Sequence, residues 1–102
     1  MDPKAAKALA TIRWCVEADR VVLLRHFRQR LAARFLMWTD VLAILDEPAV
    51  VRYGGRDRYG RPKWIVAGNG ADGPAAPGIE CVCVLETDDK GDLTVFVTIY
   101  SG

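Results

Sequence analysis

The sequence predicts an α+β fold in which two to three N-terminal helices pack on an antiparallel sheet of about four strands. Apolar residues recur at helical spacing through the first half of the chain, whereas the second half alternates between faces as strands do. The 102 residues suit a single domain. A content of 51% hydrophobic and 26% charged residues is ordinary for a globular protein and argues against disorder.

The first expected element is an amphipathic helix over residues 3–19. Asp2 suits the capping position, and Pro3 suits the first turn. The apolar stripe consists of Ala5, Leu9, Ile12 and Val16. Residues 21–24 are rich in β-formers and fit either a first strand or the lead into the next helix, since periodicity does not separate the two. We therefore divide the chain into an N-terminal helix (1–19) and a core (20–102).

Two further helices are expected before the sheet. Residues 26–35 place Phe27, Leu31 and Phe35 on one stripe, which we expect to face the core. Thr39 is a candidate N-cap for a third helix, and Asp40 suits the positive end of that helix. The helix is expected to end before Pro48, because the residue preceding a proline disfavours the α region.

The second half is expected to form the sheet. Strands are predicted over residues 50–53, 63–67, 79–86 and 93–100, with a type I turn between Asp57 and Gly60. Residues 68–78 are rich in Gly, Ala and Pro and indicate an exposed loop, and residues 87–92 indicate a hairpin. The last strand alternates strictly but is apolar on both faces. This favours a central position, with helices on one side of the sheet.

Charge is unevenly distributed along the chain. Up to Lys63 there are 13 Lys and Arg against 7 Asp and Glu, and beyond it 1 against 6. One face could therefore meet a polyanion, or the two halves could simply neutralise each other. The odd count of 3 cysteines, the lack of a secretory leader and the lack of a long apolar run lead us to expect a cytoplasmic protein with no membrane association.

The most informative motif is His26-x3-Arg30-x3-Arg34, which places an imidazole and two guanidinium groups on one helix face. Attack of an RNA 2′-hydroxyl on the adjacent phosphate needs a base, an acid for the leaving oxygen and cations around the phosphate. Histidine exchanges protons near neutral pH, and arginine binds phosphate bidentately. The motif thus predicts a catalytic face, although such spacing is also common on solvated basic helices.

A second cluster of cations and aromatic residues lies between residues 53 and 64. Cations contact phosphate, and aromatic rings stack on unpaired bases. The residues to which we assign nucleic-acid binding, including one from the second helix, are Arg28, Arg56, Arg58, Tyr59, Arg61 and Lys63. The alternative is a hairpin connection whose arginines keep it soluble.

Three residues of the last two predicted strands are further candidates for a chemical role. Tyr100, near Thr98 at the end of the last strand, could donate a proton or stack on a base, so we include it among the catalytic candidates. More often such a tyrosine is a sheet residue with its hydroxyl at the rim. Cys81 and Cys83 share a strand face. Four ligands are usual for structural zinc, so we expect these thiols to be small buried hydrophobes and expect no metal or cofactor.

These motifs together resemble a known group. Their order is His26-x3-Arg30-x3-Arg34, then Thr39-Asp40-Val41 opening a helix, then Gly55-x-Asp57-x2-Gly60-Arg61, then a closing Val97-Thr98-Ile99-Tyr100. This order resembles a widespread group of small bacterial domains of unassigned function, which in turn resembles the RelE and BrnT toxin superfamily. The resemblance runs from about residue 21 to residue 100.

The resemblance implies helices packed on an antiparallel sheet, ribonuclease action on mRNA and restraint by an antitoxin. It points to His26, Arg30 and Arg34 as the characteristic site, with Arg61 in support. In the family pattern a glycine follows the second arginine and a short turn leads to the next helix. Here the Phe-Leu-Met-Trp run of residues 35–38 fills that space, and either buries the helix junction or marks a hydrophobic partner surface.

Two classes of function follow. The first is an RNA-directed, toxin-like mRNA endoribonuclease that needs no metal, with RNA as ligand, an antitoxin-like protein as partner and a homodimer left open. The alternative is a non-catalytic RNA- or protein-binding module on the same fold, sensitive to charge reversal at Arg30 and Arg34 but not to His26→Ala. A third hypothesis is an accessory domain of a mobile element or phage, with no role in nucleic-acid binding.

Overall fold

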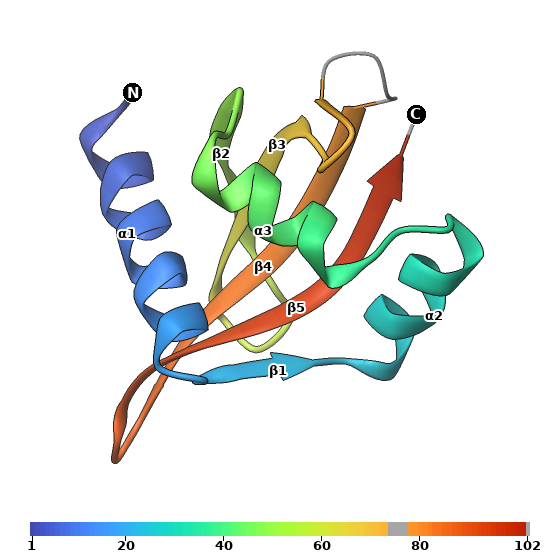
Figure 1. Cartoon of the computed structure of the whole chain (residues 1–102). Coiled ribbons are helices and arrows are strands. Elements are labelled where there is room, and N and C mark those ends of the chain that lie inside the picture. The colour runs from blue at the N-terminus through green and yellow to red at the C-terminus, as the bar shows by residue number, and fades with distance from the viewer. Residues whose placement is uncertain (74–77, 102) are drawn as a thin grey trace.

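The computed structural model describes residues 1–73 and 78–101. In this part of the chain, three helices cover a five-stranded sheet (Figure 1). The helices are α1 (Pro3–Glu17), α2 (Arg25–Ala33) and α3 (Trp38–Asp46). The strands are β1 (Val21–Leu23), β2 (Val50–Arg56), β3 (Pro62–Asn69), β4 (Gly78–Asp88) and β5 (Gly91–Ser101). The predicted α+β class is confirmed.

The sheet has the order β1-β5-β4-β3-β2 and is mixed. The prediction of about four antiparallel strands is therefore wrong, because the ambiguous residues after α1 form a fifth strand parallel to β5. Val21 lies opposite Thr94 and Leu23 opposite Phe96, whereas the other neighbouring strands are antiparallel. A segment of three residues is too short for periodicity to identify it, and its partner lies far along the chain.

Helix ends follow local hydrogen bonding. The Asp2 carboxylate accepts a hydrogen bond from the Ala5 N–H at 3.1 Å, as the sequence predicts for a cap. The prediction of Thr39 as the N-cap of α3 is wrong, since Met37 occupies that position and donates its N–H to the Asp40 carboxylate at 2.8 Å. Among the described residues, no helix is long and apolar enough to cross a bilayer.

The core lies between the sheet and the helices. Phe27 of α2 packs against Phe96 of β5 with ring centroids 5.5 Å apart, and Trp38 of α3 meets the same ring at 5.2 Å. Phe27 and Phe96 are both fully buried. Aromatic side chains supply more buried area than other residues, so this cluster is the main attachment of α2 and α3 to the last strand.

A bulge in β5 breaks the alternation that the sequence suggests. Val82 pairs with Thr98, but the next residue, Cys83, pairs with Phe96, so one extra residue lies in β5. A bulge of this kind reverses the faces of the residues that follow it. Ile99 therefore joins Phe96 in the core, whereas Thr98 and Tyr100 lie on the face turned away from α1 and α3. Strict alternation would have placed Thr98 and Tyr100 beside Phe96.

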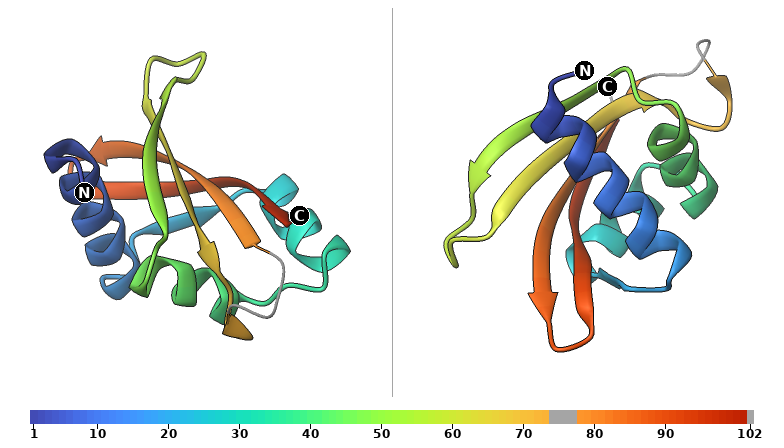
Figure 2. Two further views of the ribbon diagram at one scale, coloured as in Figure 1. Left: turned by 90° about the horizontal axis from the view of Figure 1, so that it is seen from above. Right: turned by 90° about the vertical axis from the view of Figure 1, so that its left-hand side faces the viewer.

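The two central strands are apolar on both faces, as predicted. Val82, Val84 and Val95 are buried although they lie opposite the main core. The far end of the β2–β3 hairpin projects from the body (Figure 2), whereas the rest of β3 pairs with β4 in the sheet. Of the expected loop over residues 68–78, the two ends belong to β3 and β4, and residues 74–77 lie outside the described residues.

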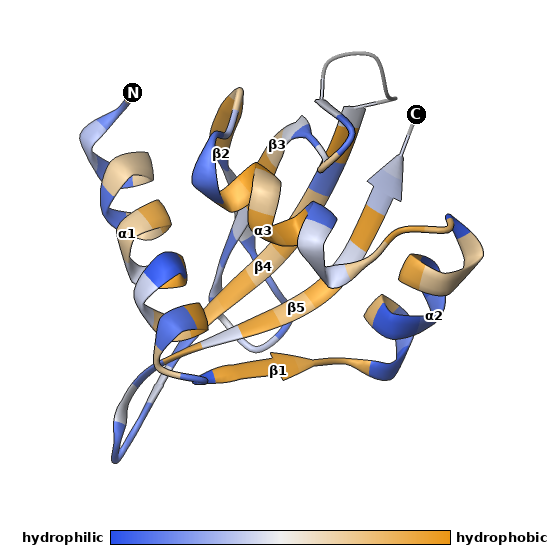
Figure 3. Cartoon of the chain, in the orientation of Figure 1, coloured by the Kyte–Doolittle hydropathy of each residue, from blue (hydrophilic) through white to orange (hydrophobic). Residues whose placement is uncertain are grey.

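Helix α2 continues the edge of the sheet where β1 stops. The Leu24 N–H still donates to the Phe96 carbonyl at 3.2 Å, and α2 begins at the next residue. Beyond Phe96, α2 lies alongside β5 (Figure 1). Its exposed side is largely hydrophilic (Figure 3), while Phe27 points into the core.

Two phenylalanines of the α2 region provide a test of this packing. We expect Phe27→Ala to lower the free energy of unfolding by about 3–5 kcal/mol, because it removes a fully buried ring and leaves a cavity. The prediction that Phe35 faces the core is wrong, because this residue follows the end of α2 with a left-handed backbone and is 94% exposed. Phe35→Ala should therefore cost less than about 0.5 kcal/mol. Urea unfolding of both variants measures the difference. Equal losses would contradict the assigned core.

Candidate functional site at the α2–β5 junction

Side chains of α2 and β5 meet at one end of the sheet. The His26 Nε2 atom lies 3.1 Å from the Thr98 hydroxyl, and the Arg30 guanidinium lies over the Tyr100 ring at 6.0 Å from its centroid. His26 and Arg30 are four residues apart and share a helix face, whereas Thr98 and Tyr100 are two apart and share a strand face. The helix pair therefore faces the strand pair. Three of the four predicted catalytic residues, His26, Arg30 and Tyr100, thus lie in one place.

The contact with Thr98 orients the imidazole of His26. The hydroxyl can accept a hydrogen bond from Nε2–H or donate one to an unprotonated Nε2, so it can hold the ring in either tautomer. Thr98 is buried, whereas His26 is exposed. The result is a histidine anchored from the sheet side and open to solvent, as an acid or base acting on a bound molecule requires.

Arg30 is half-buried and has an unmet hydrogen-bonding capacity. Its Nε atom is buried and has no hydrogen-bond partner among the described residues. A buried polar group without a partner is uncommon in native proteins and calls for an explanation. An acceptor supplied by a ligand, such as a phosphate oxygen, would provide one.

The structure does not bring Arg34 to this site. Arg34 is the C-cap of α2, and two turns of helix, about 12 Å of rise, separate it from His26. It lines a different hollow of about 190 Å³, together with Asp40 and Asp72. Arg28 also lies apart, because side chains two residues from His26 and Arg30 point away from that helix face.

The predicted nucleic-acid cluster lies at the opposite end of the sheet. Ala67 pairs with Glu80, which pairs with Tyr100. Arg61 precedes Ala67 by six residues, or about 20 Å of extended strand. Lys63 lies between the two ends, on β3 opposite Val84. The cluster and the α2–β5 junction are therefore two separate surfaces.

Arg61 has a structural role in the β2–β3 turn. Its Nε donates to Asp57 at 2.8 Å and its Nη1 to Glu86 at 3.3 Å. Although burial favours the neutral acid, hydrogen bonds from the backbone and side chain of Arg61 and from the Tyr59 N–H hold the pKa of Asp57 below its usual value. Arg61 therefore has its charge already matched within the fold.

The tip of this hairpin nevertheless presents a stacking surface. Tyr59 is exposed, and the guanidinium groups of Arg58 and Arg61 lie over its ring at 5.0 Å and 5.2 Å from the centroid. Arg56 donates to the Gly60 carbonyl at 2.6 Å, which closes the turn. An exposed aromatic ring with cations on it suits an unpaired base or a backbone phosphate.

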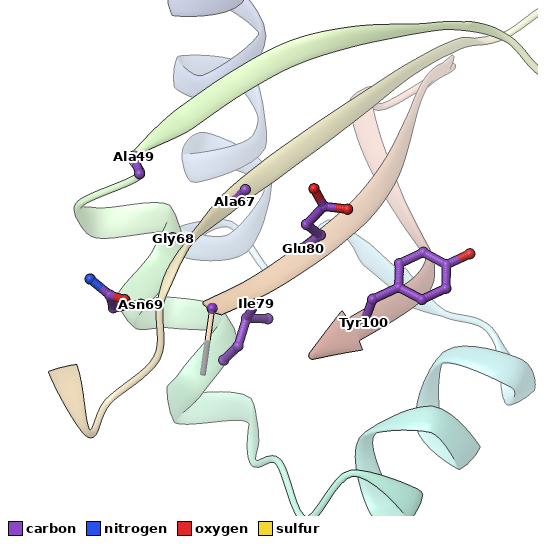
Figure 4. A pocket seen from close by; sticks show the side chains of 8 residues that line it. Ala49, Ala67, Gly68, Asn69, Ile79, Glu80 and Tyr100 are labelled. Atoms are coloured by element: carbon purple, nitrogen blue, oxygen red, sulfur yellow. The ribbon is translucent and has the colours of Figure 1, made fainter. Parts of the chain in front are cut away.

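Two residues beside the junction were not identified from the sequence. Glu80 lies next to Tyr100 across the β4–β5 pair, and its carboxylate accepts from Arg52 of β2 at 3.2 Å. Both border the face that carries Tyr100, where Glu80 and Tyr100 line a shallow hollow of about 500 Å³ (Figure 4). The strand register that places them together depends on the bulge and could not be read from the sequence.

The cysteines are buried, as predicted for small apolar residues. The Sγ atoms of Cys81 and Cys83 are 3.9 Å apart on the core side of β4. The hydrogen bond with Cys81 and burial raise the pKa of the Cys83 thiol, so it stays protonated at neutral pH. Within residues 1–73 and 78–101, no group of three His, Cys, Asp or Glu side chains could hold a metal ion.

A test of the Arg61 assignment uses acid. Because the pKa of Asp57 is lower in the folded than in the unfolded chain, its carboxylate stabilises the fold above the unfolded pKa of about 3.9, and this contribution disappears as the pH falls through the folded pKa. We expect Asp57→Asn to lower the unfolding free energy at pH 7 and the difference from wild type to shrink in acid. Urea unfolding at several pH values measures this, with Asp89→Asn as control. A difference independent of pH would contradict the assignment.

Comparison of the chain with protein family models, with curated proteins and with solved structures gave no match. The candidate site is therefore assigned from its own geometry. It consists of His26, Arg30, Thr98 and Tyr100, with Glu80 at its border.

Proposed function

We propose that this chain is an RNA-directed, toxin-like domain of the RelE/BrnT type that cleaves mRNA at the α2–β5 junction without a metal ion. The observation that carries the proposal is the meeting of His26 and Arg30 with Thr98 and Tyr100. A proton-transfer group, an available cation and an aromatic ring lie side by side and face solvent. The α+β architecture agrees with the resemblance at the level of fold class.

The chemistry would proceed by attack of the RNA 2′-hydroxyl. His26 takes the proton of that hydroxyl as the bond from O2′ to phosphorus forms. The bond from phosphorus to the 5′ oxygen breaks, and that oxygen receives a proton from the Tyr100 hydroxyl or from solvent. The products are a 2′,3′-cyclic phosphate and a 5′-hydroxyl. Arg30, whose Nε lacks a partner among the described residues, stabilises the charge on the phosphate.

The main prediction concerns growth and RNA decay. Expression of the wild-type chain should arrest growth and shorten bulk mRNA, whereas His26→Ala and Arg30→Ala should each reduce cleavage by about 100-fold or more, since each removes one group that acts in the transition state. Growth curves and end-mapping of cellular RNA measure this at equal soluble protein levels. Cleaved ends should carry a cyclic phosphate.

A matched control is available on the β4–β5 hairpin. Lys90→Ala also removes one positive charge but lies in the exposed turn, far from α2 along the chain and in the fold. It should retain full activity. The proposal would be wrong if His26→Ala and Arg30→Ala both retained cleavage, or if the well-folded wild-type chain did not cleave RNA.

A second candidate function, a protein- or RNA-binding module, is favoured by Phe35. This residue has a φ of 56°, in the left-handed region that favours glycine, and its ring is 94% exposed. It ends α2, where the Leu36 N–H donates to the Leu31 carbonyl at 2.9 Å in a turn that usually contains glycine. The left-handed backbone at Phe35 is strained, and within the described part of the chain its exposed ring makes no packing contacts that would offset this strain. A binding partner that contacts the ring would explain the presence of phenylalanine here. Met37, 68% exposed, lies two residues away.

At Phe35 we predict that a substitution stabilises the fold. We expect Phe35→Gly to raise the free energy of unfolding by about 1 kcal/mol, because it relieves left-handed strain of about 1–2 kcal/mol and loses part of that to greater chain entropy when unfolded. The same variant should lose binding of an antitoxin-like protein if the ring is the contact. Thermal unfolding measures the first effect, and co-purification measures the second. A lower stability for Phe35→Gly would contradict the strain argument.

A further inference from the structure

The hollow beside Tyr100 has a floor of small residues and carries polar side chains at its rim. On the open face of the sheet, Ala67 and Gly78 contribute at most a methyl group. Among residues 1–73 and 78–101, a Cβ added to Gly78 would meet only the Gly68 carbonyl oxygen, at 4.0 Å, so these residues leave space above it. Glu80 and Tyr100 stand on the rim of the hollow (Figure 4).

Tyr100 is positioned for stacking on one side only. Arg30 approaches its ring from α2, on the outer side of β5. The hollow lies on the other side, where its remaining walls come from β3, β4 and the residue before β2. The ring is 47% exposed, which leaves surface for a flat ligand. Gly78 lies diagonally opposite Tyr100 across the β4–β5 pair, two residues before Glu80, so a planar group seated on Gly78 could reach both Tyr100 and Glu80.

Glu80 determines which planar group fits. Its Oε1 accepts from Arg52 Nη2 at 3.2 Å, which orients the carboxylate, and its side chain remains 47% exposed. An ionised carboxylate offers only acceptors. Among the bases, guanine presents two adjacent donors, N1–H and the exocyclic amine, which match two carboxylate oxygens. Adenine and cytosine present one exocyclic amine beside an acceptor, which a carboxylate repels.

We propose that this hollow is a guanine-binding subsite, with the base stacked on Tyr100 and its Watson–Crick edge bound by Glu80. The inference rests on the proposed RNA-directed function and names the base next to the phosphate that Arg30 would hold. It holds equally for a chain that binds RNA without cleaving it. The subsite gives the α2–β5 junction a sequence preference.

The test uses titration calorimetry of the whole chain with single nucleotides. Guanosine 3′-monophosphate should bind at least about fivefold more tightly than the adenosine, cytidine and inosine equivalents, since a bidentate contact discriminates by about this factor or more. Inosine is the sharpest comparison, because it lacks only the exocyclic amine. Equal binding of guanosine and inosine nucleotides by the wild type would overturn the proposal without any variant.

Two substitutions assign the effect to the hollow. Glu80→Gln should abolish the preference for guanosine, and Ala67→Val should weaken guanosine binding by filling the floor. Asp89→Asn, which removes one carboxylate from the distant hairpin turn, should change nothing. An unaltered preference in folded Glu80→Gln protein would refute the assignment. Guanosine preference without RNA cleavage would support the subsite and reject the nuclease, and cleavage without preference would do the reverse.

Discussion

The packing of Phe27 on Phe96 is the contact on which the rest of the structure depends. It holds α2 against the final strand, and Trp38 at the start of α3 packs on the same ring. The orientation of α2 then decides which of its side chains reach around the edge of the sheet. Because Phe27 points into the core, its neighbour His26 points toward the open face, where Thr98 receives it.

Two irregularities of the sheet bring the side chains of α2 and β5 together. β1 pairs with only three residues of β5, which leaves the remaining edge free for a helix in place of a strand. The bulge in β5 then turns Thr98 and Tyr100 to the open face while Phe96 and Ile99 stay in the core. Neither feature alone would assemble the site. A full-length β1 would displace α2, and a regular β5 would bury the tyrosine.

Much of the fold could be predicted from the sequence, since the Asp2 cap, the apolar stripe of α1 and the closing hairpin are local signals, whereas the cap of α3 was assigned to Thr39 instead of Met37. Helical spacing grouped His26 with Arg30 and Arg34, and Tyr100 was a separate candidate; the structure brings Tyr100 to Arg30 and leaves Arg34 apart. The parallel strand, the bulge and the role of Glu80 depend on pairing between distant segments, which leaves no local pattern. Arg61 is a case in which the sequence suggested a function that the structure does not favour. This arginine was predicted to bind phosphate, but Asp57 and Glu86 already form ion pairs with it.

The separation of the site's two halves along the chain has a consequence for biosynthesis. His26 and Thr98 are 72 residues apart. At about 5–20 residues per second, a ribosome needs several seconds to go from one to the other. Contacts of such long range also form late in folding, after the cost of closing the loop between them. A nascent chain thus carries the imidazole early but cannot complete the site while β5 is unmade. The side chains of the α2–β5 junction therefore come together only after β5 has been synthesised.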